Sequence, residues 1–286
     1  MTPEIKAFYE EHTATVSYVL ADPASRHAAV IDPVLNYEPR AGHTSTDSAD
    51  QIVAYVNERG LTVEWLLETH PHADHLSATG YLKGRLGGKT GIGSGVCAVQ
   101  RTWTAIYDLG GEVAADGSQF DRLFDDGASF SIGKLPVTVW HVPGHTPACA
   151  AYLVEGAAFV GDTLFMPDYG TARADFPGGD ARVLYRSIRR ILSLPPETRL
   201  FTCHDYAPGG RVVAWESTVA RQRAENKHVR DGISEDDFVA MRQARDRELE
   251  LPELLLPSLQ VNIRGGCLPD PEANGTAYLK IPLNKI

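Results

Sequence analysis

The sequence predicts an α/β protein in which short strands alternate with amphipathic helices. Two observations favour this class. Several short apolar runs rich in β-branched residues stop abruptly at polar residues, glycine or proline, as strands do. Between them lie stretches whose apolar residues recur at helical spacing. With 43% hydrophobic and 22% charged residues among 286, the chain also has the composition of an ordinary globular protein rather than of a disordered or fibrous one.

In the first half, the pattern of apolar and turn-forming residues predicts two neighbouring strands, a helix, a third strand and a second helix. The expected elements are strands at 15–21, 28–32 and 62–68, a helix that Ser48 can cap and Gly60 can end, and a helix that ends at Gly87. A polar turn, 69–75, follows the third strand. Polar groups therefore gather where a buried strand ends.

The second half has the same organisation without repeating the sequence. We expect strands at 137–142, 157–160 and 199–203, a helix over 180–192, and charge-rich surface helices within 222–249. Each of the three strands stops at a polar residue, which is His145, Asp162 or His204. We expect one domain over 1–286, with a helical and irregular C-terminal extension from about residue 212.

Charge and hydropathy limit the classes of partner. The formal net charge of −10 argues against nucleic acid and against an anionic membrane surface. No apolar run approaches the roughly 20 residues that a membrane-spanning helix needs. The first residues lack the basic and then apolar pattern of a secretion signal, and the 4 cysteines lie far apart. We therefore expect a cytoplasmic protein that acts on a small molecule.

Histidines cluster in one short segment. His70, His72 and His75 are 3 of the 10 histidines of the chain, and Asp74 lies among them. Imidazole nitrogen and carboxylate oxygen are common ligands of zinc, iron and manganese. Because other histidines and aspartates follow three later strands, the pattern predicts that strand-end loops direct them into one metal pocket.

These segments together resemble the metallo-β-lactamase superfamily. The matching motifs are Asp32 after the second strand, THPHADH at 69–75, PGHT at 143–146, GDTLF at 161–165 and CHDY at 203–206. The resemblance covers most of the chain up to about Tyr206. It implies an αββα sandwich, in which two mixed β-sheets are flanked by helices and metal lies at the strand ends.

The same resemblance implies a set of metal ligands. In the two-metal pattern of the superfamily, one set is His70, His72 and His145, and a second set is Asp74, His75 and His204. Asp162 would bridge the two sets, and Asp32 would orient the histidine loop.

Within the superfamily, the chain looks most like the persulfide dioxygenases, which are also called sulfur dioxygenases. That family binds a single Fe(II), and the resemblance carries its ligands over to His70, His145 and Asp162. Two histidines and one carboxylate leave coordination positions open for O₂ and a sulfur ligand. The implied reaction oxidises glutathione persulfide with O₂ to sulfite and glutathione.

Two further residues carry this likeness. The stretch 170–176 and HDY at 204–206 resemble dioxygenase segments in which an arginine and a tyrosine help to bind glutathione, here Arg173 and Tyr206. A structural alternative is also open: Arg173 pairs with Asp175 or Asp180, and Tyr206 packs beside the metal loop.

Other functions are compatible with the same loops. A hydrolase of the glyoxalase II kind would use two Zn²⁺ ions to activate water for thioester or ester cleavage. A non-catalytic metal-binding protein is the third possibility, although structural zinc sites usually close at four ligands. The dioxygenase likeness also makes a homodimer plausible.

Overall fold

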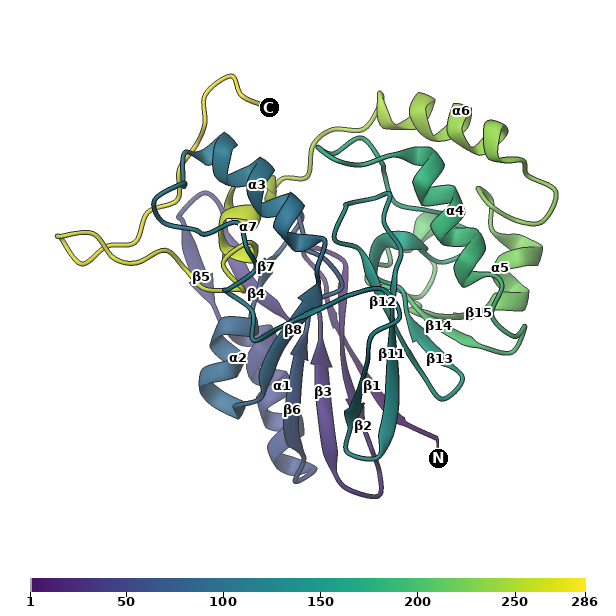
Figure 1. Ribbon diagram of the computed structural model, residues 1–286, viewed down its shortest axis with the longest axis horizontal. Helices are drawn as coiled ribbons and strands as arrows, with labels where there is room; N and C mark the ends of the chain where they lie inside the picture. Colours follow the sequence, from purple (N-terminus) through teal and green to yellow (C-terminus); the bar gives the residue numbers. More distant parts are fainter. Residues whose placement is uncertain (1) are drawn as a thin grey trace.

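Two six-stranded β-sheets lie face to face at the centre of the molecule (Figure 1). The protein is seen here in a computed structural model that describes residues 2–286. The first sheet has the order β1 (Glu4–Glu10), β2 (Thr15–Ala21), β3 (His27–Ile31), β6 (Thr62–Leu67), β8 (Lys89–Gly93) and β9 (Arg122–Phe124). The second has the order β10 (Ser129–Ile132), β11 (Leu135–His141), β12 (Ala150–Val154), β13 (Ala157–Phe159), β14 (Arg199–Phe201) and β15 (Glu216–Thr218). A small third sheet joins β5 (His43–Ser45), β4 (Val34–Glu38) and β7 (Leu76–Ser77).

Both large sheets are mixed. In the first, β1, β2 and β3 are antiparallel, whereas β3, β6, β8 and β9 run parallel. In the second, only the β13 and β14 pair is parallel. The parallel register pairs Ile31 with Leu67, so β3 and β6 end together. Asp32 and the histidine segment therefore leave the sheet at the same edge.

The alternation of side chains along β2 shows how the layers form. Val16, Tyr18 and Leu20 face the core between the two sheets. Val19 and Ala21 face the opposite way, into the core between the first sheet and its helices. All seven residues of this strand are buried because it has a packed layer on each side.

The helices cover the outer faces of the sheets. Their bounds are α1 (Asp47–Glu58), α2 (Thr79–Leu86), α3 (Val96–Tyr107), α4 (Ala181–Ile191), α5 (Val219–Glu225), α6 (Glu235–Asp246) and α7 (Leu255–Asn262), with short 3₁₀ turns η1 (Gly161–Thr163) and η2 (Pro208–Gly210). Helices α1 and α2 pack on the first sheet, and α4 packs on the second. Helix α6 packs against α4, and α7 packs against α3.

The predicted αββα sandwich is confirmed, and the strands and helices expected from the sequence are present with shifts of a few residues at their ends. One detail differs. Ser48 does not cap α1, since the helix begins one residue earlier and the Ser48 N–H donates to the Asn36 side chain (2.9 Å). The sequence interpretation also did not assign the helices α3 and α7 or the strands β1, β4, β5, β7, β8, β9, β10, β12 and β15. Among residues 2–286, no helix is long and apolar enough to cross a membrane.

Candidate metal centre

The histidine segment leaves β6 and is held by an aspartate from the neighbouring strand end. Asp32 follows β3 with a φ of +49°, a conformation in which aspartate is tolerated better than most residues. Its carboxylate accepts hydrogen bonds from the Thr69 N–H (2.7 Å) and the Thr69 hydroxyl (2.8 Å). These bonds fix the backbone at the point where the chain turns toward His70.

The other polar residues come from strand ends of the second sheet. His145 follows β11, Asp162 lies in η1 directly after β13, and His204 follows β14. The His145 Nδ1–H donates to the backbone carbonyl of Arg173 (2.8 Å). Because that bond fixes the protonated nitrogen, the Nε2 lone pair of His145 is available to the centre of the site.

One group of potential ligands contains His70, His145 and Asp162, whose ligand atoms all lie within 4.8 Å of one another. The Asp162 Oδ2 is 3.8 Å from the His70 Nε2 and 3.6 Å from the His145 Nε2. All three side chains are buried. The structure therefore brings together the three residues that the dioxygenase resemblance selects.

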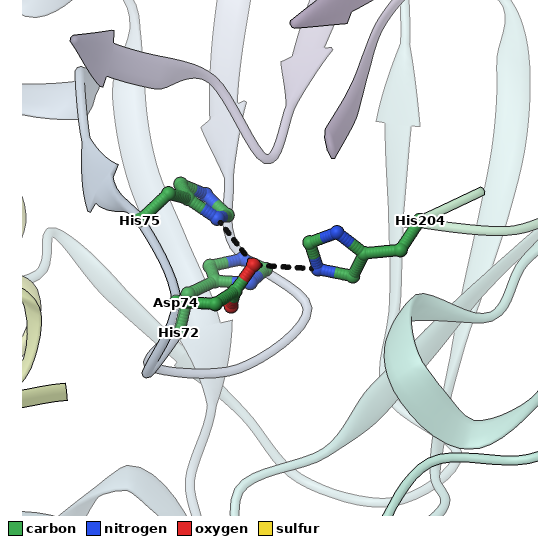
Figure 2. A group of neighbouring side chains, drawn as sticks. All are labelled: His72, Asp74, His75 and His204. Atoms are coloured by element: carbon green, nitrogen blue, oxygen red, sulfur yellow. Dashed lines mark hydrogen bonds and ion pairs between the residues drawn. The ribbon is translucent and has the colours of Figure 1, made fainter. Parts of the chain in front are cut away.

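A second group contains His72, Asp74, His75 and His204 (Figure 2). In the figure the Asp74 carboxylate points between two imidazoles, with its Oδ2 3.5 Å from His75 and 3.1 Å from His204. The Asp162 Oδ1 lies 3.4 Å from the His204 Nε2. Asp162 thus touches both groups, as a bridging residue would.

The two-metal expectation, which grouped His72 with His70 and His145, stays a prediction. The ring centroid of His72 lies 4.1 Å from that of His70 and 4.2 Å from that of His75, so His72 lies beside ligands of both groups. It belongs to the second group, and its Nε2 lies 3.1 Å from Asp32 and 3.4 Å from Glu68. The two buried carboxylates attract this nitrogen and orient the ring. The other oxygen of Glu68 accepts hydrogen bonds from the hydroxyls of Ser77 and Thr79, which hold it in place.

Several atoms at the centre have no hydrogen-bond partner among the described residues. They belong to six residues at the centre: Glu68 Oε2, His70 Nε2, His72 Nδ1 and Nε2, His75 Nε2, His204 Nε2 and Asp162 Oδ1. Buried polar atoms are rarely left unpaired, because desolvation without a partner costs free energy. Some of these atoms lie beside carboxylates, as His204 Nε2 does beside Asp74 and Asp162, and such close sets of nitrogen and carboxylate oxygen suit a metal cation. The His and Asp side chains therefore form a site fitted to a metal cofactor.

The charges of the two groups differ. Burial, together with the nearby His72 and His145, holds the pKa of His70 well below its usual value, so its imidazole is neutral and able to bind a metal. Burial also acts to lower the pKa of His204, but the carboxylates of Asp74 and Asp162 outweigh it and raise that pKa well above its usual value. Within the same group the pKa of His75 moves the other way, because burial and the nearby His72 lower it. The carboxylates therefore attract positive charge at His204 in particular.

The C-terminal segment also supports the metal loop. Asn262, at the end of α7, donates through its side-chain amide to the backbone carbonyls of His72 and His75, both at 2.8 Å. Its side-chain oxygen accepts from the Ser77 N–H (2.8 Å). This one amide satisfies three backbone groups of the loop that carries four potential ligands.

A cavity of about 300 Å³ opens onto the centre, and its lining includes Asp74, His145 and Asp162. Tyr206 also lines it, and 43% of this residue is exposed. The Tyr206 ring lies nearly parallel to the His204 ring at 5.8 Å and 4.6 Å from the ring of Tyr169. Tyr206 is therefore both packed beside the metal loop and open to a ligand.

Arg173 lines the same cavity, but its guanidinium is already engaged. It donates two hydrogen bonds to Asp175 (2.6 and 2.8 Å) and one to the Glu250 carbonyl (2.7 Å). Of the two structural partners considered for Arg173, the structure selects Asp175, because Asp180 accepts from the first N–H groups of α4.

Sequence reasoning missed several residues of the centre and its cavity: Glu68, Tyr169, Arg242, Arg245 and Asn262. One of them left a signal, since Glu68 is a carboxylate at the end of a buried strand, directly before THPHADH. The others reach the site through tertiary packing and leave no local pattern.

This fold and this cluster of strand-end ligands define a class of metal-binding proteins, and comparison with known sequences identifies it. The sequence profile of the metallo-β-lactamase superfamily matches residues 13–204. The chain therefore belongs to the metallo-β-lactamase superfamily.

Particular relatives differ in their described activities. A probable metallo-hydrolase of Burkholderia pseudomallei is 56% identical, over 99% of both chains. A β-lactamase hydrolase-like protein of Agrobacterium fabrum is also 56% identical over 99% of this chain, which spans only 65% of that relative's length. Glyoxylase B2 of Dictyostelium discoideum is 50% identical, over 98% of this chain and 97% of its own.

The likeness to persulfide dioxygenases is more distant and also extends over most of the chain. The human mitochondrial persulfide dioxygenase ETHE1 is 29% identical over 92% of this chain and 88% of its own. Among solved structures, ETHE1 from Myxococcus xanthus superposes with a TM-score of 0.74 at 27% identity, covering 92% of this chain and 100% of that one.

Proposed function

We propose that the protein is a non-haem iron(II) dioxygenase that oxidises glutathione persulfide with O₂ to sulfite and glutathione. The observation that carries the proposal is the buried group of His70, His145 and Asp162, which faces an open cavity. Per turnover, one persulfide, one O₂ and one water give one thiol, one sulfite and two protons. One Fe(II) per chain is the proposed cofactor.

Bound Fe(II) would supply open coordination positions for O₂ and for the persulfide sulfur, together with the redox chemistry that couples them. The residues of the chain supply the rest. The Arg173 carbonyl fixes the His145 ring through its Nδ1–H, and Asp162 contributes negative charge beside both imidazoles. Phe165 and Phe176, both largely buried, form apolar parts of the cavity wall and limit the access of water.

The likeness to persulfide dioxygenases over 92% of the chain supports this proposal. The described cluster also matches it, because its three-residue group is the pattern of two histidines and one carboxylate that non-haem iron oxygenases use. We further propose that the substrate is a small thiol or persulfide, that the chain forms one domain with an extension from about residue 212, and that it assembles as a homodimer.

A second candidate is a hydrolase of thioesters or esters that uses two Zn²⁺ ions. The observation that favours it is the second group, His72, Asp74, His75 and His204, together with the contact of Asp162 with His204. The relatives described as metallo-hydrolase and Glyoxylase B2 have names that agree with this candidate. In this case two metals would hold the attacking hydroxide.

Metal content and oxygen consumption test the proposal. Protein purified anaerobically without added metal should contain about one iron per chain, as a site with one set of three ligands requires. It should consume O₂ when glutathione persulfide is added and not with glutathione alone. The proposal is overturned if the Fe(II)-loaded protein shows only background O₂ uptake, and hydrolysis of lactoylglutathione with two bound zinc ions would favour the second candidate.

The variant His204→Ala separates the two candidates. His204 lies outside the group of His70, His145 and Asp162, so a dioxygenase with one iron should retain its iron. A hydrolase with two metals should lose the second metal and, with it, about 100-fold or more in kcat, because one of the metals that activate water would be gone. Elemental analysis and both activity assays on the variant give the answer.

A further inference from the structure

The cavity wall contains three guanidinium groups, and two of them are committed to carboxylates. Arg173 is bound by Asp175. Arg242, which is buried, donates to Asp246 (2.8 Å) and to the Thr171 carbonyl (3.1 Å). Both side chains therefore have structural partners that a ligand would have to displace.

The third guanidinium belongs to Arg245, at the end of α6. Within residues 2–286 this guanidinium forms no hydrogen bond or ion pair, and it lies over the Tyr169 ring, 6.0 Å from the ring centroid. Glu250 and Glu253 line the same wall, yet neither pairs with it. All five N–H donors of this partly buried arginine are thus available to a ligand in the cavity.

A second cation lies beside it. The Lys227 ammonium is 5.3 Å from the centroid of the same Tyr169 ring and, within the described chain, has no hydrogen bond or ion pair. Burial, followed by the positive charges of Arg245 and Arg242, lowers the pKa of Lys227, while Asp168 opposes that shift. Lys227 is exposed and lies outside the cavity lining, which also includes Glu250 and Glu253, so the two cations meet at the Tyr169 ring rather than along the whole wall.

Aromatic rings connect this corner with the metal centre. Tyr169 lies between Arg245 and Tyr206, and Tyr206 lies against His204. Each step of this series is 6.0 Å or less. A flexible molecule the size of a tripeptide, roughly 10 Å when extended, can follow such a wall with its sulfur directed to the metal centre.

We propose that Arg245, supported by Lys227 and by the ring of Tyr169, binds a carboxylate of the substrate. The inference rests on the proposed function, which names glutathione persulfide as the substrate, and it adds the residue that would bind a carboxylate remote from the reacting sulfur. A guanidinium fork is suited to such a group because it donates two parallel hydrogen bonds to one carboxylate.

The test compares glutathione with its diethyl ester, whose carboxylates are masked. Binding of each to the metal-loaded protein is measured by calorimetry, and KM and kcat for glutathione persulfide are measured by O₂ uptake. Arg245→Gln should weaken glutathione binding and raise KM by about tenfold, the loss expected for a charge-assisted hydrogen bond, with kcat within about twofold. Binding of the ester should not change, and Arg245→Lys should recover part of the affinity.

The matched control is Arg247→Gln, which removes the same charge two residues further on. Arg247 is exposed and lines a separate surface groove, so its loss should leave both binding and KM unchanged. The inference is overturned if Arg245→Gln behaves like Arg247→Gln, or if the wild type does not bind glutathione more tightly than the ester.

The two proposals fail separately. If the wild type binds glutathione through Arg245 but consumes no O₂ with the persulfide, the dioxygenase proposal fails and the carboxylate site stands. If O₂ uptake is robust and Arg245→Gln leaves KM unchanged, the carboxylate site fails alone.

Discussion

The metal centre and the outer wall of its cavity are built from different parts of the chain. The potential ligands all follow strands of the two large sheets, and they lie within residues 13–204, the segment that matches the superfamily profile. The outer wall includes Arg242 and Arg245 of α6, and the loop that follows this helix. The superfamily fold thus carries the potential metal ligands, and if the carboxylate proposal holds, a segment beyond residue 204 would select the substrate.

The largest effect should follow from removing a ligand of the first group. His145→Ala and Asp162→Ala should each abolish iron binding and lower activity about 1000-fold or more, because a site with three protein ligands loses one of them. Iron content and O₂ uptake measure this. His43→Ala, which removes an exposed histidine, is the control and should behave as wild type. If Asp162→Ala retained full iron content, the centre would not be the one proposed.

The two regions also differ in how far the sequence predicts them. Four of the potential ligands lie close together within residues 70–75, and the other three, His145, Asp162 and His204, each follow the end of an expected strand. Both patterns can be read from the sequence. Within the metal centre, however, the contacts of His72 with Asp32 and Glu68 depend on side-chain packing, which the spacing of residues in the sequence does not predict.

Nothing local marks the outer wall. Arg245 lies in a charge-rich segment that reads as a solvated helix face, and its position in a cavity depends on how α6 docks against α4. Asn262 lies in a tail that the sequence analysis left unassigned. Such residues acquire their role from tertiary contacts across more than 180 positions, as the bonds from Asn262 to His72 and His75 illustrate.

Asn262 connects α7 with the loop of the metal centre, so its substitution tests whether the metal centre depends on the C-terminal segment. In Asn262→Ala, two buried carbonyls and the Ser77 N–H lose their partner, so the loop that carries His72, Asp74 and His75 should become less ordered. We expect metal affinity to fall by about 10-fold to 100-fold, as for other residues that orient metal ligands. Competition with a chelator measures the affinity.

The matched control is Asn274→Ala, because Asn274 is exposed in the C-terminal tail and donates only to Tyr278. Circular dichroism should show that both variants are folded. Equal metal affinities in the two variants would contradict this prediction. They would mean that the strand-end loops keep their geometry without support from α7.

The smallest effect should come from Arg173, whose predicted role the structure makes less direct. Arg173→Gln should raise KM for glutathione persulfide by less than about threefold, because its guanidinium is already bound by Asp175 and the Glu250 carbonyl and has little left for a ligand. The carbonyl that holds His145 belongs to the backbone and survives the substitution. Steady-state O₂ uptake measures KM and kcat, with Asp175→Asn as a companion variant that breaks the same ion pair. A tenfold rise in KM for Arg173→Gln, without a rise for Arg245→Gln, would place the carboxylate site at Arg173, within residues 13–204, and not on α6. Substrate selectivity would then belong to the same region as the metal centre.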